Sequence, residues 1–237
     1  PSARPPTTTS GRALELDPEH DALKAQGDLA GAVASYRRAL ELDPEDAAAH
    51  HNLGIALKAQ GDLAGAVASY RRALELDPED ADAHYNLGVA LDDQGDLPGA
   101  EAAYRRALEA QPDYANTLCN LGNLLRQRGG AARLREAEDL LRRAVALDPG
   151  SAIKATNLGK VLQKKANLEE AEALFRQALE LQPQKALRRW NLGLVLEDKG
   201  DWAGAEAQFR EGMALDPKDP NYARKVGEMR RKQGLEG

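Results

Sequence analysis

The sequence has little of what most enzymes and disulfide-stabilised domains use. Its 237 residues include a single cysteine, Cys119, and four histidines, and aromatic residues make up 4%. A single cysteine excludes an internal disulfide and gives no zinc framework. No apolar run approaches the roughly 18 residues of a membrane span. We therefore expect no metal, no cofactor and no membrane span. Nothing assigns a compartment, and the cytoplasm is the default expectation.

The charge balance argues against one class of partner. The formal net charge is −6, which disfavours the phosphate backbone of a nucleic acid as the main ligand. Charged residues nevertheless make up 30% of the chain, and this composition favours surface-rich helices over a large aromatic core.

Residues 47–80 show how the chain is organised. A first helix is expected from about Ala47 to Gln60, and Gly61 can end it in the left-handed conformation. Asp62 can then cap a second helix that runs from about Leu63 to Leu76. Pro78 cannot continue that helix. The stretch therefore predicts a helical hairpin whose apolar face needs a neighbour to cover it.

This hairpin recurs with a period of 34 residues. The glycine of the first helix returns at intervals of 34, 34, 37, 34 and 34 residues, at Gly54, Gly88, Gly122, Gly159, Gly193 and Gly227. The long interval marks a three-residue insertion near Gly129 to Arg133, which we place in the turn between the paired helices. Residues 22–46 are identical to residues 56–80, which indicates recent duplication or a consensus-like design.

The period gives the predicted boundaries. They are a disordered arm or linker at 1–11, a truncated first repeat at 12–46, repeats at 47–80, 81–114, 115–151 (with the insertion), 152–185 and 186–219, and a C-terminal capping helix and tail at 220–237. The first repeat lacks eight residues of its first helix, so the chain is either a piece of a longer array or begins with a degenerate cap.

The phase of the repeat also predicts the core. One large residue of each second helix falls at the same site: Tyr36, Tyr70, Tyr104, Leu141, Phe175 and Phe209. A small residue recurs at a second site, where it lets helices approach closely: Ala32, Ala66, Ala100, Ala137, Ala171 and Ala205. A leucine of each first helix fills a third: Leu57, Leu91, Leu125, Leu162 and Leu196.

A 34-residue helical hairpin with N-L-G, G-D-L, an alanine-rich second helix and D-P resembles the tetratricopeptide repeat family. The resemblance covers residues 12–234, although the large aromatic that is usual early in the first helix is absent here. It implies an all-α, right-handed α-solenoid of stacked helix-turn-helix repeats. It also implies that the first helices line a concave groove in which partners bind.

Asparagine recurs two residues before each glycine of the first helices, except the last, which has Lys225. These residues form an expected ladder: Asn52, Asn86, Asn120, Asn157 and Asn191. An amide side chain can pair with both the N–H and the C=O of a peptide, so a row of them could hold an extended chain. The alternative is that asparagine serves the geometry of the hairpin. The ladder is similar to that in the repeat arm of O-linked N-acetylglucosamine transferases, where it holds substrate polypeptide.

Three neighbours of the ladder are candidates for setting specificity. Tyr85 and Trp190 each precede a ladder asparagine and are amphipathic aromatic anchors; the alternative is packing against the adjacent repeat. Lys160, with Arg126 and Lys164, makes the middle of the array basic, although solvated helix faces are the simpler interpretation.

Two other functions have little support. Repeat domains that hold chaperone C-terminal carboxylates use a lysine four residues before the ladder site, and here that position carries Ala48, Asp82, Asn116, Ile153 and Leu187. His50 and His84 are equivalent residues of adjacent repeats, but a metal site would need a third ligand such as His51. Cys119 has no histidine nearby in phase. We expect no enzymatic activity.

The sequence thus predicts a protein-protein interaction scaffold that binds an extended polypeptide in its groove. Two alternatives stay open: the substrate-recognition arm of a larger enzyme such as a glycosyltransferase, and a structural subunit that docks into an assembly. The missing N-terminal closure also predicts possible self-stacking at that end.

Overall fold

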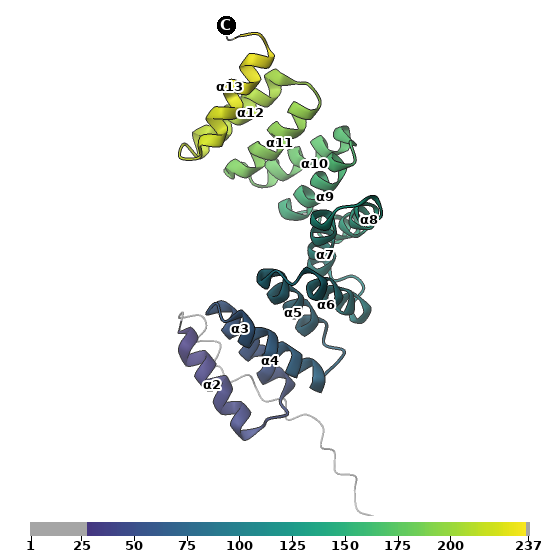
Figure 1. Cartoon of the computed structure of the whole chain (residues 1–237), viewed down its shortest axis with the longest axis vertical. Coiled ribbons are helices and arrows are strands. Elements are labelled where there is room, and N and C mark those ends of the chain that lie inside the picture. The colour runs from purple at the N-terminus through teal and green to yellow at the C-terminus, as the bar shows by residue number, and fades with distance from the viewer. Residues whose placement is uncertain (1–27, 236–237) are drawn as a thin grey trace, which may run out of the picture. The chain divides into compact units, whose positions relative to one another are not determined.

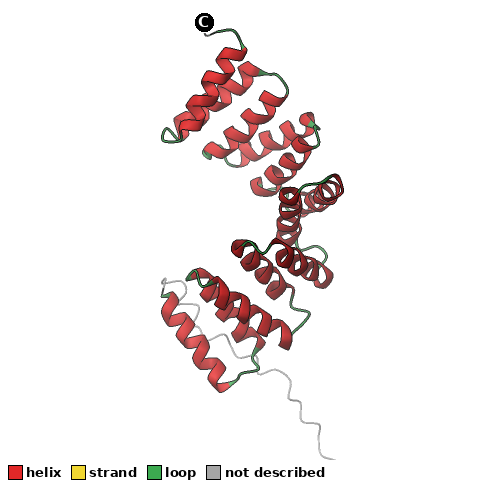
Figure 2. Cartoon of the chain, in the orientation of Figure 1, coloured by secondary structure: helices red, strands yellow, loops and turns green. Residues whose placement is uncertain are grey.

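The structure is a computed structural model and describes residues 28–235. The predicted arm at 1–11, the turn glycine Gly27 and the start of the truncated repeat lie outside the described residues. Every regular element in the described part is an α-helix (Figures 1 and 2). The described chain forms two compact units, one that ends at Ala110 and one that begins at Gln111.

Within each unit, successive helices pack pairwise and each pair packs on the next, which confirms the all-α stacked-hairpin fold. The first unit contains α2 (Leu29–Leu42), α3 (Ala47–Ala59), α4 (Leu63–Leu76), α5 (Ala81–Gln94) and α6 (Leu97–Ala110). The second contains α7 (Ala115–Arg128), α8 (Ala131–Leu147), α9 (Ala152–Lys164), α10 (Leu168–Leu181), α11 (Ala186–Asp198), α12 (Trp202–Leu215) and α13 (Pro220–Lys232). No helix among residues 28–235 combines the length and the apolar character that crossing a membrane requires.

The turns follow the expected chemistry. Gly61 takes a φ of +87° after α3, and Asp62 accepts a hydrogen bond from the backbone nitrogen of Gly65 at 2.9 Å, which caps α4. Gly95 and Gly200 adopt similar angles. Ala166 stands at the equivalent position between α9 and α10 and is forced to a φ of +60°, the one non-glycine with positive φ in the described chain.

The three-residue insertion does not lie where the sequence placed it. The turn between α7 and α8 consists of Gly129 and Gly130, and α8 has 17 residues against 14 in α4. The extra residues therefore lengthen α8 by three. Ala131, Ala132 and Arg133 are strong helix formers, so extending the helix is more favourable than enlarging the turn.

The core is built from a close approach within each helix pair. The large second-helix residues are buried, as predicted, and those from Tyr70 onward lie against the glycine of the preceding first helix. A Cβ on Gly54 would come within 2.6 Å of the Tyr70 ring, and one on Gly193 within 2.6 Å of Phe209. Glycine is thus required at these sites because the aromatic ring occupies the space that a side chain would need.

The last helix packs on its unit through two faces, one apolar and one basic. Tyr222 and Met229 of α13 are buried. On another side, Lys225 and Lys232 donate to the carboxylate of Glu197 on α11, at 2.5 and 2.8 Å. Ion pairs therefore add to the apolar contacts that hold α13 to its unit.

Candidate functional site

The asparagines belong to one accessible stripe on each first helix. Four residues at successive spacings of four, three and four lie on one side of a helix. On the first helices α3 to α11, the first and fourth of these residues are exposed, and the second and third are half-buried. The exception is Asn191, which is buried. We call this stripe the ladder face. In the first unit it consists of Ala48, Asn52, Ile55 and Ala59 on α3, and Asp82, Asn86, Val89 and Asp93 on α5. In the second unit it consists of Asn116, Asn120, Asn123 and Gln127 on α7; Ile153, Asn157, Lys160 and Lys164 on α9; and Leu187, Asn191, Leu194 and Asp198 on α11.

Two ladder amides are tied to the preceding first helix. In the first unit, Asn86 Nδ2 donates to His51 Nε2 at 2.8 Å. In the second unit, Asn157 Nδ2 donates to the sulfur of Cys119 at 3.3 Å. Each bond uses one of the two amide protons, and it leaves the oxygen and the second proton able to pair with a ligand.

Asn191 differs from the other ladder residues. It is 4% exposed, and its Nδ2 has no hydrogen-bond partner. Thr156 stands where Cys119 stands one repeat earlier, but its hydroxyl donates to the carbonyl of Ala152 and accepts from Arg188 Nη1 at 2.8 Å. The residue that would receive the Asn191 amide is therefore already engaged.

The two aromatic candidates make packing contacts within their units. The Trp190 ring lies 5.3 Å from that of Phe209 and 5.2 Å from that of Tyr222, edge to face with the latter. Tyr85 is half-buried, with its ring 6.3 Å from that of Tyr104. Their role as peptide anchors stays a prediction.

Three cations lie on successive first helices of the second unit. Lys160 of α9 is half-buried, and its pKa is lowered by burial and by the charges of Arg126 on α7 and Arg188 on α11. Burial also lowers the pKa of both arginines. The sequence analysis did not single out Arg188. The available signal was a cation at equivalent places in successive repeats, Lys154 and Arg188, where earlier repeats have Ala49, Ala83 and Thr117.

The other candidates do not form a site. His50 Nε2 lies 3.0 Å from the carbonyl of Pro44, and His84 Nε2 lies 2.9 Å from that of Pro78. Each histidine side chain thus contacts the turn that precedes its own helix. No group of three or more possible metal ligands is found among residues 28–235.

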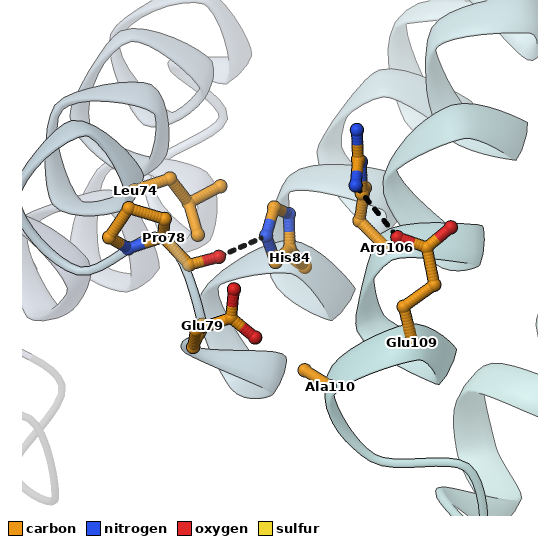
Figure 3. Close-up of a pocket in the computed structure, with 7 residues that line it drawn as sticks. All are labelled: Leu74, Pro78, Glu79, His84, Arg106, Glu109 and Ala110. Atoms are coloured by element: carbon orange, nitrogen blue, oxygen red, sulfur yellow. Dashed lines mark hydrogen bonds and ion pairs between the residues drawn. The ribbon is translucent and has the colours of Figure 1, made fainter.

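A small cavity of about 280 Å³ lies in the first unit, away from the ladder face (Figure 3). Three of its polar side chains are already paired, because Arg106 and Glu109 form an ion pair at 2.8 Å and His84 contacts the carbonyl of Pro78. No ladder-face residue contributes to it.

Comparison with known proteins agrees with this architecture. A tetratricopeptide repeat model matches residues 51–115 and 156–220, and a second TPR repeat model matches residues 21–61. No match was found among curated proteins.

Several solved structures share the fold. YrrB, described as a TPR protein with an unusual peptide-binding site, is 25% identical over 81% of this chain and 98% of its own, with a TM-score of 0.69. MamA is 25% identical over 69% of this chain and 94% of its own, with a TM-score of 0.63. A tetratricopeptide repeat protein from Parabacteroides merdae is 20% identical over 92% of this chain and 85% of its own, with a TM-score of 0.74. The similarity to glycosyltransferase repeat arms stays a prediction. With its repeats matched over more than half of its length, the chain belongs to the tetratricopeptide repeat family.

Proposed function

We propose that this protein is an interaction module that holds an extended polypeptide along the ladder face. The observation that carries the proposal is the accessibility pattern of that face: half-buried amides flanked by exposed residues, repeated on α3 and α5 of the first unit and on α7 and α9 of the second. A half-buried amide is held in place by its surroundings and still has one side open to a ligand.

The chemistry of the amides suits a polypeptide backbone. Asn157 is oriented by its bond to Cys119, and Asn86 by its bond to His51. A donor and an acceptor that are fixed before binding lose little side-chain entropy when a peptide arrives. Because each amide pairs with backbone groups, the row tolerates different peptide sequences, while neighbouring side chains select among them.

Apolar residues of the same face offer further contacts. Ile153 and Leu187 are exposed at equivalent positions of α9 and α11, and they are 58% and 55% accessible. Apolar side chains of a bound segment could cover them and gain roughly 25 cal/mol for each Å² removed from water. The similarity to YrrB, whose description includes a peptide-binding site, supports the same class of ligand.

The proposal is tested by selecting binders from a displayed library of random peptides with the full chain as bait. The affinity of a selected peptide is then compared between the unmodified protein and the double variant Asn120→Ala, Asn157→Ala. Loss of two backbone hydrogen bonds is expected to weaken binding by about tenfold or more.

The matched control is the double variant Asn167→Ala, Gln184→Ala, which removes two exposed amides outside the ladder face. Its affinity should equal that of the unmodified protein. Failure to select any peptide, or equal affinity of the ladder variant and the control, would reject the proposed function.

A further inference from the structure

We infer that Lys160, together with Arg126 and Arg188, forms a cationic subsite on the first helices of the second unit that takes a carboxylate side chain of the bound polypeptide. The inference rests on the proposed function, since it names which polypeptide segments the ladder face prefers. It adds a selectivity that the backbone-directed amides cannot supply.

The cluster carries three positive charges. Arg126, Lys160 and Arg188 come from three successive first helices, and the pKa of Lys160 is lowered first by burial and then by the charges of the two arginines. Like charges that are brought together at partly buried positions cost free energy unless an opposite charge is present. The free protein therefore carries an arrangement that is unfavourable by itself.

The cluster has no counter-charge among residues 28–235. Lys160 makes no ion pair with any carboxylate in residues 28–235. Arg188, only 8% exposed, donates instead to neutral groups, Gln182 Oε1 at 2.8 Å and Thr156 Oγ1 at 2.8 Å. Arg126 likewise donates to the neutral side-chain oxygen of Asn123 at 2.8 Å. Within residues 28–235, the two arginines therefore donate to amide and hydroxyl oxygens, and none of the three cations pairs with an acid.

The acids that lie near the cluster in this unit are engaged elsewhere and do not neutralise it. Lys154, at the position equivalent to Arg188, is neutralised by Asp148 at 2.8 Å. Asp198, the acidic member of this ladder face, accepts a hydrogen bond from Gln163 Nε2 at 2.6 Å. Lys154 thus has an acidic partner, whereas Arg126, Lys160 and Arg188 have none among residues 28–235.

Lys160 is close to a ladder asparagine. It follows Asn157 by three residues on α9 and lies on the same ladder face. If the backbone of a peptide pairs with Asn157, a side chain of that peptide can reach the ammonium group of Lys160. An Asp or Glu at that point would supply the absent charge through a charge-assisted hydrogen bond. The subsite is distinct from a terminal-carboxylate clamp, whose first basic position is occupied in this unit by Asn116, Ile153 and Leu187.

The test uses the same random-peptide display with the full chain as bait and reads the composition of the selected peptides. The unmodified protein is expected to enrich Asp and Glu at a fixed distance from the other selected positions. The Lys160→Gln variant should lose that enrichment and bind a selected acidic peptide about tenfold more weakly. The Lys160→Glu variant should lose the acidic enrichment completely, because the new carboxylate would itself neutralise the charges of Arg126 and Arg188.

The control is Lys218→Gln, which makes the same charge change at an exposed site between α12 and α13 and should leave the enrichment intact. Selected peptides without acidic enrichment, or enrichment that persists in Lys160→Glu, would overturn the inference and leave the proposed function standing. A selection that yields no peptides would reject both.

A second measurement needs no variant. Binding of an acidic selected peptide to the unmodified protein should weaken as sodium chloride is raised, because salt screens a half-exposed charge pair. An affinity that is independent of salt would also overturn the inference.

Discussion

The side-chain nitrogen of Asn157 donates to the sulfur of Cys119 across 3.3 Å, and this bond joins two successive first helices of the second unit through the ladder itself. The amide is therefore part of the stacking between repeats as well as a candidate for ligand binding. The two roles that the sequence left as alternatives for the asparagines are compatible, because an amide has more than one bonding group.

The environment of Cys119 makes its thiol unreactive in the folded protein. Burial raises the pKa of the thiol, and the hydrogen bond from Asn157 and the charge of Lys154 oppose this only in part. The thiolate is the reactive form, so reaction with an aromatic disulfide reagent at neutral pH should be far slower in the native than in the urea-unfolded protein. Equal rates would contradict the described burial.

The raised pKa of Cys119 makes the free energy of unfolding depend on pH. Below the pKa of an exposed thiol, about 8.5, the group is protonated in both states and contributes nothing. Above it the unfolded chain loses a proton that the folded chain retains, so Cys119 should lower the free energy of unfolding as pH rises. Urea titrations at neutral and alkaline pH should show a smaller decline in Cys119→Ala than in the unmodified protein.

Gly193→Ala should destabilise the protein by about 1–2 kcal/mol, because overpacking a filled core is costly. The added Cβ would lie 2.6 Å from the ring of Phe209, which is 0% exposed and cannot move aside. The matched control is Gly227→Ala on α13, where the nearest atom is the flexible end of Arg231 at 3.6 Å. That change should stabilise by about 0.5–1 kcal/mol through helix propensity. Thermal unfolding of both variants measures the contrast, and shifts of the same sign would contradict it.

Ala166→Gly should stabilise the protein by about 0.5–1 kcal/mol, since an L-residue with a side chain is strained at a φ of +60° and glycine is not. The reciprocal change Gly200→Ala, at a φ of +80° in the next repeat, should destabilise by about 1 kcal/mol. Urea unfolding midpoints of the two variants should move in opposite directions. A lower midpoint for Ala166→Gly would show that this turn does not have the described conformation.

Glu197→Gln should loosen the attachment of α13. Burial acts to raise the pKa of Glu197, but the hydrogen bonds from Lys225 and Lys232 outweigh it and lower the pKa below its usual value. Removing the charge should cost about 1–2 kcal/mol. The exposed Glu180→Gln on α10 is the control and should change little.

The lowered pKa of Glu197 determines how its contribution to the free energy of unfolding changes with pH. Its contribution is fully present above the unfolded pKa of a glutamate, about 4.3, and is lost as pH falls through the lower, folded value. The difference in free energy of unfolding between the unmodified protein and Glu197→Gln should therefore shrink on acidification. A difference that grows as pH falls would contradict the ion pair.

Most of the fold could be predicted from the period of the repeat. Because a residue at a fixed phase has the same neighbours in every repeat, glycine at 61 and aspartate at 62 were enough to predict the helix end and the cap. The buried sites of Tyr70, Phe175 and Leu162 followed in the same way. The insertion was misplaced because two glycines suggested a longer turn, whereas the alanines after them continue the helix.

The candidate site could be predicted in outline only. Periodicity placed the asparagines on one side of the first helices, but the bond of Asn157 to Cys119 and the burial of Asn191 depend on which residue the preceding repeat presents. Arg188 was missed because a charged residue near the start of a helix looks like a solvated one in sequence. Its contact with Thr156 on another repeat is what buries it.

The most direct test of the central claim follows the side-chain NH₂ signals of the ladder in a ¹⁵N NMR spectrum while a selected peptide is added. The signals are assigned by the single changes Asn120→Ala and Asn157→Ala. If the amides of the ladder face hold the peptide, the Asn120 and Asn157 signals should shift with saturation, and those of Asn167 and Gln184 should stay in place. Saturable binding that leaves the Asn120 and Asn157 signals unmoved, and shifts only signals of the second helices, would contradict the account.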